Sequence, residues 1–508
     1  MTRFLVPLLW LTATATSSQF APPRALTGPG VALSNDQVNP DEVTFNKDVL
    51  PILQNNCQVC HRPGEAGPMS FLTYETTRPW AKAIKQAVIT RKMPPWFADP
   101  SHGSFRNDPT LTGREIATLA AWADRGAPEG NPQDKPKAVE WPNGWRIEPD
   151  VVISIPEPYR IPAKGSGEIK SFLVANPFQQ DTWVSSIEIR PGNASVVHHA
   201  MVQIPEDTPA ARPFSWGATA APCFSPPTAF PPQDFKGPLP LAILNQLNRG
   251  VQPQAVSPPK NFAILEAVYA PGSAPMDFSV YDSAKLIPGG GKLRIEVHYT
   301  PNGTATSDQT KIGFKLARET PRYRYVTLAP KSLADPLKRI PAGEANWETR
   351  GELEFGQDAE LVWLMPHMHL RGKDMRFKLV APNGRAETVL DAQFNFNWQL
   401  GYEMEEPIRV RRGTQLTVVA HHDNSANNPY NPDPAQEVSW GDLTSEEMVL
   451  PWFGVLVDRN ADPEKILAIR QDACTAAAAA PGAPALPGPV PAIPRLSLPA
   501  IEIFEDGR

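Results

Sequence analysis

Short runs of β-branched residues, each ended by proline, glycine or asparagine, recur between residues 150 and 460. The clearest are "DVVISIPE", "WVSSIEIRPG", "VVHHAMVQI", "KLRIEVHYT", "MRFKLVAPNG" and "TQLTVVAHHD". A chain with 59 prolines among 508 residues suits many short strands joined by rigid turns better than long helices, and its 41% of hydrophobic residues can fill cores. The pattern predicts antiparallel strands in all-β sandwich domains.

A different pattern precedes residue 130. The run "NNCQVCHRPGEAGPM" contains Cys57, Cys60 and His61 in the order C-x-x-C-H. Two thiols at this spacing can each form a thioether to one edge of a haem, while the adjacent imidazole reaches the iron. The motif therefore predicts one covalently attached haem c. The C-x-x-C part alone would equally suit a redox dithiol or half of a zinc site.

Helical segments surround this motif. They are expected from about Phe45 to Asn55, along "RPWAKAIKQAVITRK", and along "LTGREIATLAAWADRG". In the last of these, Thr112 and Glu115 form a capping box, and Gly126 ends the helix. We therefore predict a small all-α domain over residues 41–130, and this region resembles class I cytochromes c.

Spacing alone leaves the sixth iron ligand open. Met93 in "RKMPPW" lies between the haem motif and the last helix, as the distal methionine does in class I cytochromes c, and it is the predicted ligand. Met69 and His102 are alternatives. A packing role for Met93 is another, because methionine commonly fills irregular gaps in a core.

The amino terminus has the composition of a targeting segment. Residues 1–21, "MTRFLVPLLWLTATATSSQFA", place one basic residue ahead of an apolar stretch that gives way to small and hydroxylated residues, as in a secretory signal peptide. No later stretch reaches the roughly 18 to 20 apolar residues of a membrane span. We expect an exported protein, periplasmic or secreted, without a membrane span beyond the signal segment. A retained amino-terminal anchor is the alternative.

Three further segments lack regular periodicity. Residues 131–150 are a polar, proline-bearing linker, residues 205–259 a proline-heavy insertion, and residues 471–508 a Pro/Ala-rich tail. The two cysteines outside the haem motif, Cys223 and Cys474, could form a disulfide in an oxidising compartment. The formal net charge of -6 argues against a nucleic-acid partner, which requires clustered positive charge.

Most of the histidines lie in the strand-rich part. Seven of the nine are found there: His198, His199, His298, His367, His369, His421 and His422. In "PHMHL" two histidines are two residues apart, so both imidazoles point to the same side of a strand and can share one ion. Pro366 before them suits a strand end or edge.

The other histidine groups are less regular. In "KLRIEVHYT" the alternation puts His298 on the face opposite Leu293 and Ile295. The adjacent pair His198 and His199 would face opposite sides of a regular strand, so a shared metal requires a bulge there. One buried and one exposed histidine is the alternative. Imidazoles combined with a thioether favour copper over zinc, since soft sulfur stabilises Cu(I).

The order of these motifs carries a family resemblance. The succession "VVHHAMV", "VHY", "HMHLRGK" and "TSEEMVL" is similar to that of the copper type II, ascorbate-dependent monooxygenases, the family of peptidylglycine alpha-hydroxylating and dopamine beta-monooxygenases. The resemblance spans about residues 150 to 460. It implies two jelly-roll-like sandwich domains, over residues 151–310 and 311–470, each holding one copper across a solvent-filled cleft.

The resemblance also implies ligands and an activity. His198, His199 and His298 would hold an electron-transfer copper. A second copper, which activates O2 to hydroxylate a C–H bond of a small-molecule or peptide substrate, would be held by His367, His369 and Met448. An external one-electron donor, ascorbate or a redox protein, would supply electrons. For His421, a pocket-lining role and a structural role in the following turn both remain open.

The cytochrome region suggests an addition to this scheme. A haem carrier fused to an enzyme that consumes two electrons per turnover is expected to act as an internal donor. The leading interpretation is an exported monooxygenase with two coppers and one haem c. A non-catalytic electron-transfer or copper-binding protein is the alternative, and a sandwich with degenerate sites is a third.

Overall fold

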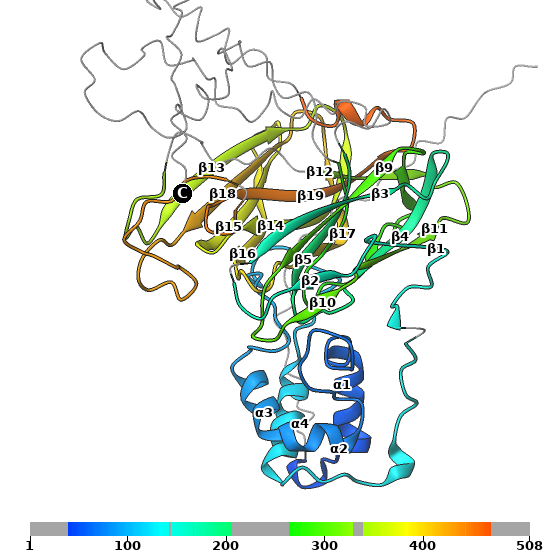
Figure 1. Ribbon diagram of the computed structural model, residues 1–508, viewed down its shortest axis with the longest axis vertical. Helices are drawn as coiled ribbons and strands as arrows, with labels where there is room; N and C mark the ends of the chain where they lie inside the picture. Colours follow the sequence, from blue (N-terminus) through cyan, green and yellow to red (C-terminus); the bar gives the residue numbers. More distant parts are fainter. Residues whose placement is uncertain are drawn as a thin grey trace, which may run out of the picture.

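The computed structural model describes residues 39–141, 144–165, 167–205, 264–328, 339–441 and 443–468. The predicted signal segment, nearly all of the proline-heavy insertion, the Pro/Ala-rich tail, Cys223 and Cys474 lie outside these residues. In the described part a small helical unit lies at one end of a larger body of β-sheets (Figure 1). None of the helices described is long and apolar enough to cross a membrane.

The helical unit contains the three helical segments that the sequence predicts. Its elements are η1 (Pro40–Glu42), the π-helical turn η2 (Phe45–Val49), α1 (Leu50–Asn56), α2 (Tyr74–Thr77), η3 (Arg78–Trp80), α3 (Ala81–Ile89), α4 (Gly113–Asp124) and η4 (Pro132–Asp134). Helices α1, α3 and α4 enclose a core in which Phe45, Leu53, Leu119 and Trp122 are fully buried.

Helix α4 begins and ends as its sequence predicts. The Thr112 hydroxyl accepts a hydrogen bond from the Glu115 backbone N–H at 3.2 Å, and the Glu115 carboxylate accepts one from the Thr112 backbone N–H at 2.8 Å. This is a reciprocal capping box. Gly126, with φ of 79°, then adopts the left-handed conformation that ends the helix.

The β-body consists of sandwich-like sheets. One sheet has nine strands, in the order β1 (Val151–Ser154), β11 (Lys311–Leu316), β4 (Thr182–Arg190), β8 (Ser283–Ile287), β12 (Tyr323–Leu328), β19 (Val449–Asp458), β14 (Ala359–Met368) and β17 (Tyr402–Val410), with β7 (Met276–Asp277) beside β4. Two four-stranded sheets run β3 (Glu168–Ala175), β9 (Lys292–Tyr299), β5 (Val197–Ile204), β6 (Ile264–Tyr269), and β13 (Trp347–Glu354), β18 (Gln415–His422), β15 (Gly372–Val380), β16 (Ala386–Gln393). Strands β2 (Tyr159–Ile161) and β10 (Thr306–Asp308) form a pair. All six runs singled out from the sequence are strands.

The nine-stranded sheet belongs to two sandwich halves at once. Its first strands share one core with the β3-β9-β5-β6 sheet, and β12, β19, β14 and β17 share a second core with the other four-stranded sheet. The halves join where β8 pairs with β12, the one parallel pair among the named strands. Because β11 pairs with β1 and β4, the first half ends after β11 and not at residue 310 as expected from the sequence.

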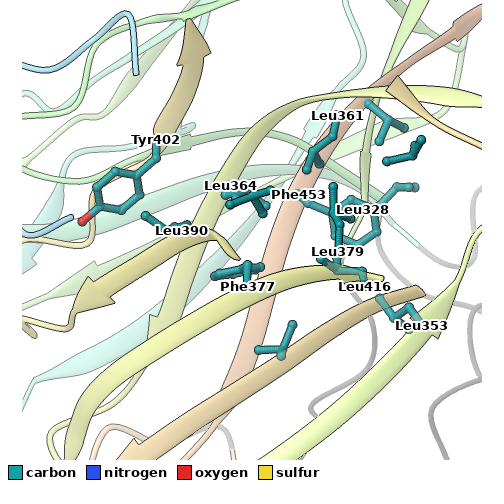
Figure 2. Close-up of a cluster of buried hydrophobic side chains, with 14 of the residues drawn as sticks. Leu328, Leu353, Leu361, Leu364, Phe377, Leu379, Leu390, Tyr402, Leu416 and Phe453 are labelled. Atoms are coloured by element: carbon teal, nitrogen blue, oxygen red, sulfur yellow. The ribbon is translucent and has the colours of Figure 1, made fainter. Parts of the chain in front are cut away.

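Strand β14 contributes to both cores. Leu364 (Figure 2) and Met368 belong to the core of the second half, whereas Trp363 and Met365 belong to the core of the first. Alternation along the strand produces this division, because successive side chains lie on opposite faces. The face that carries Trp363 and Met365 continues to His367, and this continuation positions the candidate site.

Candidate metal centre

A bulge in β5 brings the adjacent histidines together. The register of β5 against β9 shifts between Val197 and His199, as a shared site required. The Nδ1 atoms of His198 and His199 lie 3.2 Å apart, and His298 of β9 pairs directly with His199. Ring nitrogens of the three histidines all lie within 4.8 Å of one another. The structure therefore assembles the predicted first set.

Burial keeps these three imidazoles neutral. It lowers the pKa of His198 to about 4 and that of His298 to about 3, and it holds the pKa of His199 well below its usual value. A neutral imidazole offers a lone pair to a cation. Among the described residues the buried Nδ1 of His298 has no hydrogen-bond partner. A buried nitrogen without a partner, beside two other imidazoles, is what is expected of a residue that binds a metal ion.

The second pair lies at the end of β14. His367 and His369 are both buried, and their ring centroids are 5.6 Å apart. The Nδ1–H of His367 donates to the side-chain oxygen of Gln399 at 2.6 Å, and the Nδ1 of His369 lies 3.0 Å from the Glu446 carbonyl oxygen. Metal-bound histidines are typically oriented in this way, through the ring nitrogen that does not bind the metal.

Pro366 occupies the kind of position that its sequence context predicts. It lies within β14 and pairs in register with Pro451 of β19. On the other side, the pairing of β14 with β17 ends at Leu364. Pro366 is therefore at a local sheet edge. Because no strand pairs with it on that side, its lack of an N–H costs the sheet no hydrogen bond.

Met448 is tied to the second pair through Glu447. Met448 is half-buried and directly precedes β19, whose first residue, Val449, pairs with Met368. One oxygen of the Glu447 carboxylate accepts hydrogen bonds from the backbone N–H groups of His369, at 3.1 Å, and of Met448, at 3.4 Å. The predicted methionine and histidine thus share one anchoring carboxylate.

The two histidine sets adjoin each other. The ring centroids of His199 and His367 are 5.7 Å apart, and the Thr444 hydroxyl oxygen of the second half lies 3.0 Å from Nε2 of His298. The expectation of a solvent-filled cleft between the sets is therefore wrong for this structure. Because the shared sheet fixes the two halves side by side, the five imidazoles form one cluster.

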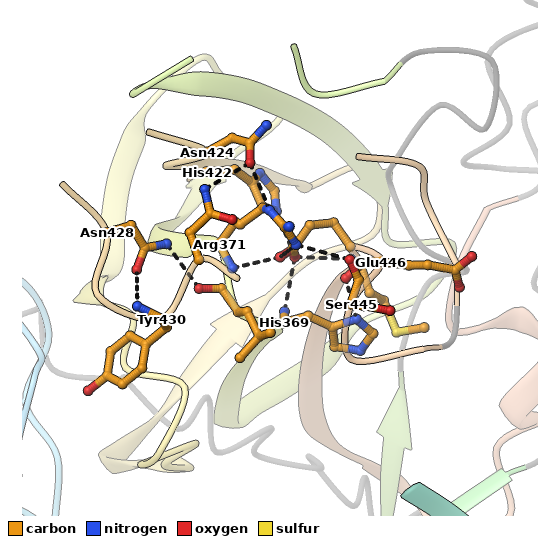
Figure 3. Close-up of polar contacts among 12 residues, drawn as sticks. His369, Arg371, His422, Asn424, Asn428, Tyr430, Ser445 and Glu446 are labelled. Carbon is orange, nitrogen blue, oxygen red and sulfur yellow. Dashed lines mark hydrogen bonds and ion pairs between the residues drawn. The ribbon is translucent and has the colours of Figure 1, made fainter. Parts of the chain in front are cut away.

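Sequence reasoning missed a buried polar network behind His369 (Figure 3). Glu447 also accepts from the Arg371 backbone N–H at 2.6 Å, and the Arg371 guanidinium donates to Asn424 at 2.9 Å. Burial raises the pKa of Glu447 to about 7. Glu447 could have been noticed from its place before Met448, but nothing in the local sequence pattern indicated Gln399.

The last two histidines have different surroundings. His421 of β18 donates from Nδ1 to a carboxylate oxygen of Asp374, on the neighbouring strand β15, at 2.6 Å. This favours the structural alternative for His421. His422 is fully buried, with its Nε2 3.6 Å from Glu447 and its ring against Trp440.

The haem motif has the geometry that a proximal histidine requires. Cys57 and Cys60 are not joined in a disulfide, and burial raises the pKa of both thiols, that of Cys57 to about 12. The Nδ1 of His61 lies 3.3 Å from the Met69 carbonyl oxygen, and the ring stacks on Phe71. A bond at Nδ1 directs Nε2 away from that carbonyl and toward a ligand, so these residues fit an attached haem.

The candidates for the sixth ligand lie apart. The Met69 backbone is on the Nδ1 side of the His61 ring, opposite the nitrogen that would bind iron. His102 lies with Asp99 and Asp391, where the helical unit meets β16. Met93 is half-buried in the segment after α3 and stays the predicted ligand.

Comparisons with known proteins give no family. No family model matches the chain, and no curated protein is similar in sequence. Among solved structures, PBCV-1 VP54, fitted into a reconstruction of the virophage Sputnik, is 8% identical over 63% of this chain and 98% of its own, with a TM-score of 0.20. The infectious bursal disease virus Gt strain structure is 9% identical over 63% and 75%, with a TM-score of 0.14. Similarities this weak carry no argument about fold or function.

Proposed function

We propose that this chain is a copper-dependent monooxygenase of the copper type II, ascorbate-dependent kind, fused to a cytochrome c. The observation that carries the proposal is the cluster of five imidazoles drawn from both sandwich halves, four of them buried and His198 half-buried. The lowered pKa values of His198, His199, His298 and His367 and the orienting hydrogen bonds support metal binding.

The residues divide into two ligand sets. His198, His199 and His298 would hold one copper, and the set of His367, His369 and Met448 would hold the other. Bound copper supplies one-electron redox chemistry and the activation of O2 for C–H hydroxylation. The chain itself lowers the pKa of four of the imidazoles, orients His198 and His367 through carbonyl oxygens, and buries all but His198.

The helical unit is proposed to supply electrons. Cys57 and Cys60 would attach a haem, with His61 as proximal and Met93 as distal ligand. Cys60 faces an open cavity that is also lined by Glu188 of β4 and by Tyr269 of β6, so the motif lies against the sandwich body. An attached haem would therefore be directed toward the electron-consuming part of the same chain.

Metal and haem analysis tests the assignment. Wild-type protein is expected to contain about two coppers and one haem per chain, and His367→Ala to lose roughly one copper and keep its haem. His421→Ala is the matched control, because this strand histidine bonds Asp374 outside the cluster. Full copper retention in His367→Ala would refute the assignment.

Oxygen uptake separates the enzyme from a non-catalytic carrier. Copper-loaded protein with ascorbate should consume O2 faster when an organic substrate is added, whereas a carrier shows no substrate dependence. Rapid mixing of the fully reduced protein with O2 and substrate then tests the internal donor. Haem oxidation that lags behind product formation would exclude a donor role for the helical unit.

A further inference from the structure

The segment that follows β16 and includes the first two residues of β17, residues 394–403, contacts both histidine sets. The carbonyl oxygen of Phe396 accepts a hydrogen bond from Nε2–H of His198 at 2.8 Å, and the Phe396 ring stacks on the same imidazole with centroids 4.2 Å apart. Three residues later, Gln399 accepts from His367 at 2.6 Å. We call residues 394–403 the bridging segment.

The two anchoring groups are linked to each other. The Gln399 side chain is buried, and its amide N–H donates to the Phe396 carbonyl oxygen at 3.4 Å, the same oxygen that holds His198. A displacement of this short segment would therefore move one imidazole in each set. Metal ligands are commonly tuned by such outer partners.

The helical unit forms hydrogen bonds to the carboxy-terminal end of the bridging segment. The side chain of Asn107 donates to the Gly401 carbonyl oxygen at 2.8 Å and accepts from the Glu403 backbone N–H at 3.0 Å. Arg106 adds a backbone hydrogen bond and an ion pair of 2.7 Å to Glu403. The carboxy-terminal end of the segment is thus held by a residue of the helical unit.

A cavity lies along the same path. It has a volume of about 320 Å³, and its lining includes Val59, between the two motif cysteines, Trp96 of the helical unit, and Gln399. Val59 of the haem motif and Gln399, which bonds His367, therefore line the same cavity.

We propose that the bridging segment is a shared positioning element, in which Phe396 and Gln399 orient one imidazole of each set and Asn107 makes their position depend on the docked helical unit. This inference rests on the proposed metal-binding function. It gives the helical unit a second role beside electron supply, because its docking sets the geometry of the metal centre.

Two substitutions of Gln399 test the positioning role. Gln399→Met keeps the approximate volume but removes the acceptor for His367, whereas Gln399→Glu keeps an acceptor. We expect Gln399→Met to weaken copper binding by roughly 10- to 100-fold, measured by competition with a chelator, and to change the Cu(II) EPR hyperfine splitting. Gln399→Glu should remain close to wild type. Asn397→Ala is the control, since this exposed amide of the same segment bonds Tyr430.

Substitution of Asn107 tests the connection to the helical unit. Asn107→Ala should shift the Cu(II) EPR signal in the same direction as Gln399→Met, although the hydrogen bonds that it removes go to Gly401 and Glu403 and not to a histidine. Asn55→Ala, an exposed amide of the helical unit on the same cavity, should leave the signal unchanged. Equal spectra for Asn107→Ala and wild type would overturn the coupling.

The outcomes separate this inference from the proposed function. If wild-type protein binds no copper, the proposed function is refuted, and the positioning role with it. If it binds copper and Gln399→Met and Asn107→Ala bind with unchanged affinity and spectra, the proposed function stands and the positioning role is refuted. Circular dichroism of each variant identifies any that fails to fold.

Discussion

A charged pair is buried where the two sandwich halves meet. The ammonium group of Lys285 on β8 donates to the Leu265 and Glu266 carbonyl oxygens and to the Thr327 hydroxyl, and it lies 3.3 Å from the Glu266 carboxylate. Burial raises the pKa of Glu266 and lowers that of Lys285, while each charge offsets the shift of the other. The charged form of each residue is therefore stabilised in the interior by its partner.

Removal of the lysine should destabilise the fold. Lys285→Met leaves Glu266 buried without its counter-charge, and the expected loss in unfolding free energy is about 3–5 kcal/mol, measured by urea denaturation. The double variant Lys285→Met, Glu266→Leu removes both charges and should recover most of the loss. A double variant as unstable as the single one would contradict the pairing.

The unfolding free energy of Lys285→Met should depend on pH. Without Lys285, the pKa of folded Glu266 stays above its unfolded value, so the folded state binds a proton that the unfolded state releases. The unfolding free energy of Lys285→Met should therefore be greatest below pH of about 4.3 and fall as the pH rises from there. Denaturation curves between mildly acidic and neutral pH check this, and a stability that rises over that range would refute the assignment.

At the scale of residues, the sequence predicts groups that carry recognisable chemistry. The histidine sets could be proposed because imidazole is rare and its spacing is informative. Gln399 and Arg371 could not be proposed, because glutamine and arginine are common surface residues and only folding shows that these two are buried. Their roles depend on contacts between segments distant in sequence.

At the scale of elements, helix α4 offers a direct test of local sequence rules. Thr112→Ala removes the N-cap hydroxyl that accepts from Glu115, and we expect a loss of about 1 kcal/mol in the stability of the helical unit. Thermal unfolding followed by circular dichroism measures it. Thr110→Ala is the control, an exposed threonine outside the helix, and an equal effect of both substitutions would argue against the cap.

Element types were predictable from periodicity, but element partners were not. All six strand runs and all three helical segments follow from local pattern. The bulge at His199 was only a requirement of the metal hypothesis, and the pairing of β8 with β12 has no local signal, because two short strands of similar composition can pair in many registers.

At the scale of the whole molecule, the shared sheet should make the two sandwich halves unfold together. Strand β19 lies between β12 and β14 and supplies side chains to both cores. We expect a single urea transition for the tryptophan fluorescence of the β-body, because neither half can lose its strands of the long sheet alone. Two separate transitions would contradict this.

The helical unit should stay attached without its covalent linker. It pairs with the second half through backbone hydrogen bonds from Asp99 to Asp391, at 2.7 Å, and from Arg106 to Glu403, at 2.9 Å. A protease site inserted after the exposed Lys135 should be cut readily, and the two fragments should still co-elute in gel filtration. Separate elution would mean that the linker alone holds the helical unit in place.

The docking of Cys60 against β4 and β6 also sets an order of events during biosynthesis. The core of the helical unit comes from one continuous stretch near the amino terminus, whereas the strands that cover Cys60 are synthesised later. A chain that emerges amino terminus first presents both thiols before their cover exists. Attachment of the proposed haem would therefore be easiest on the nascent or partly folded chain, before β4 and β6 line the space beside Cys60.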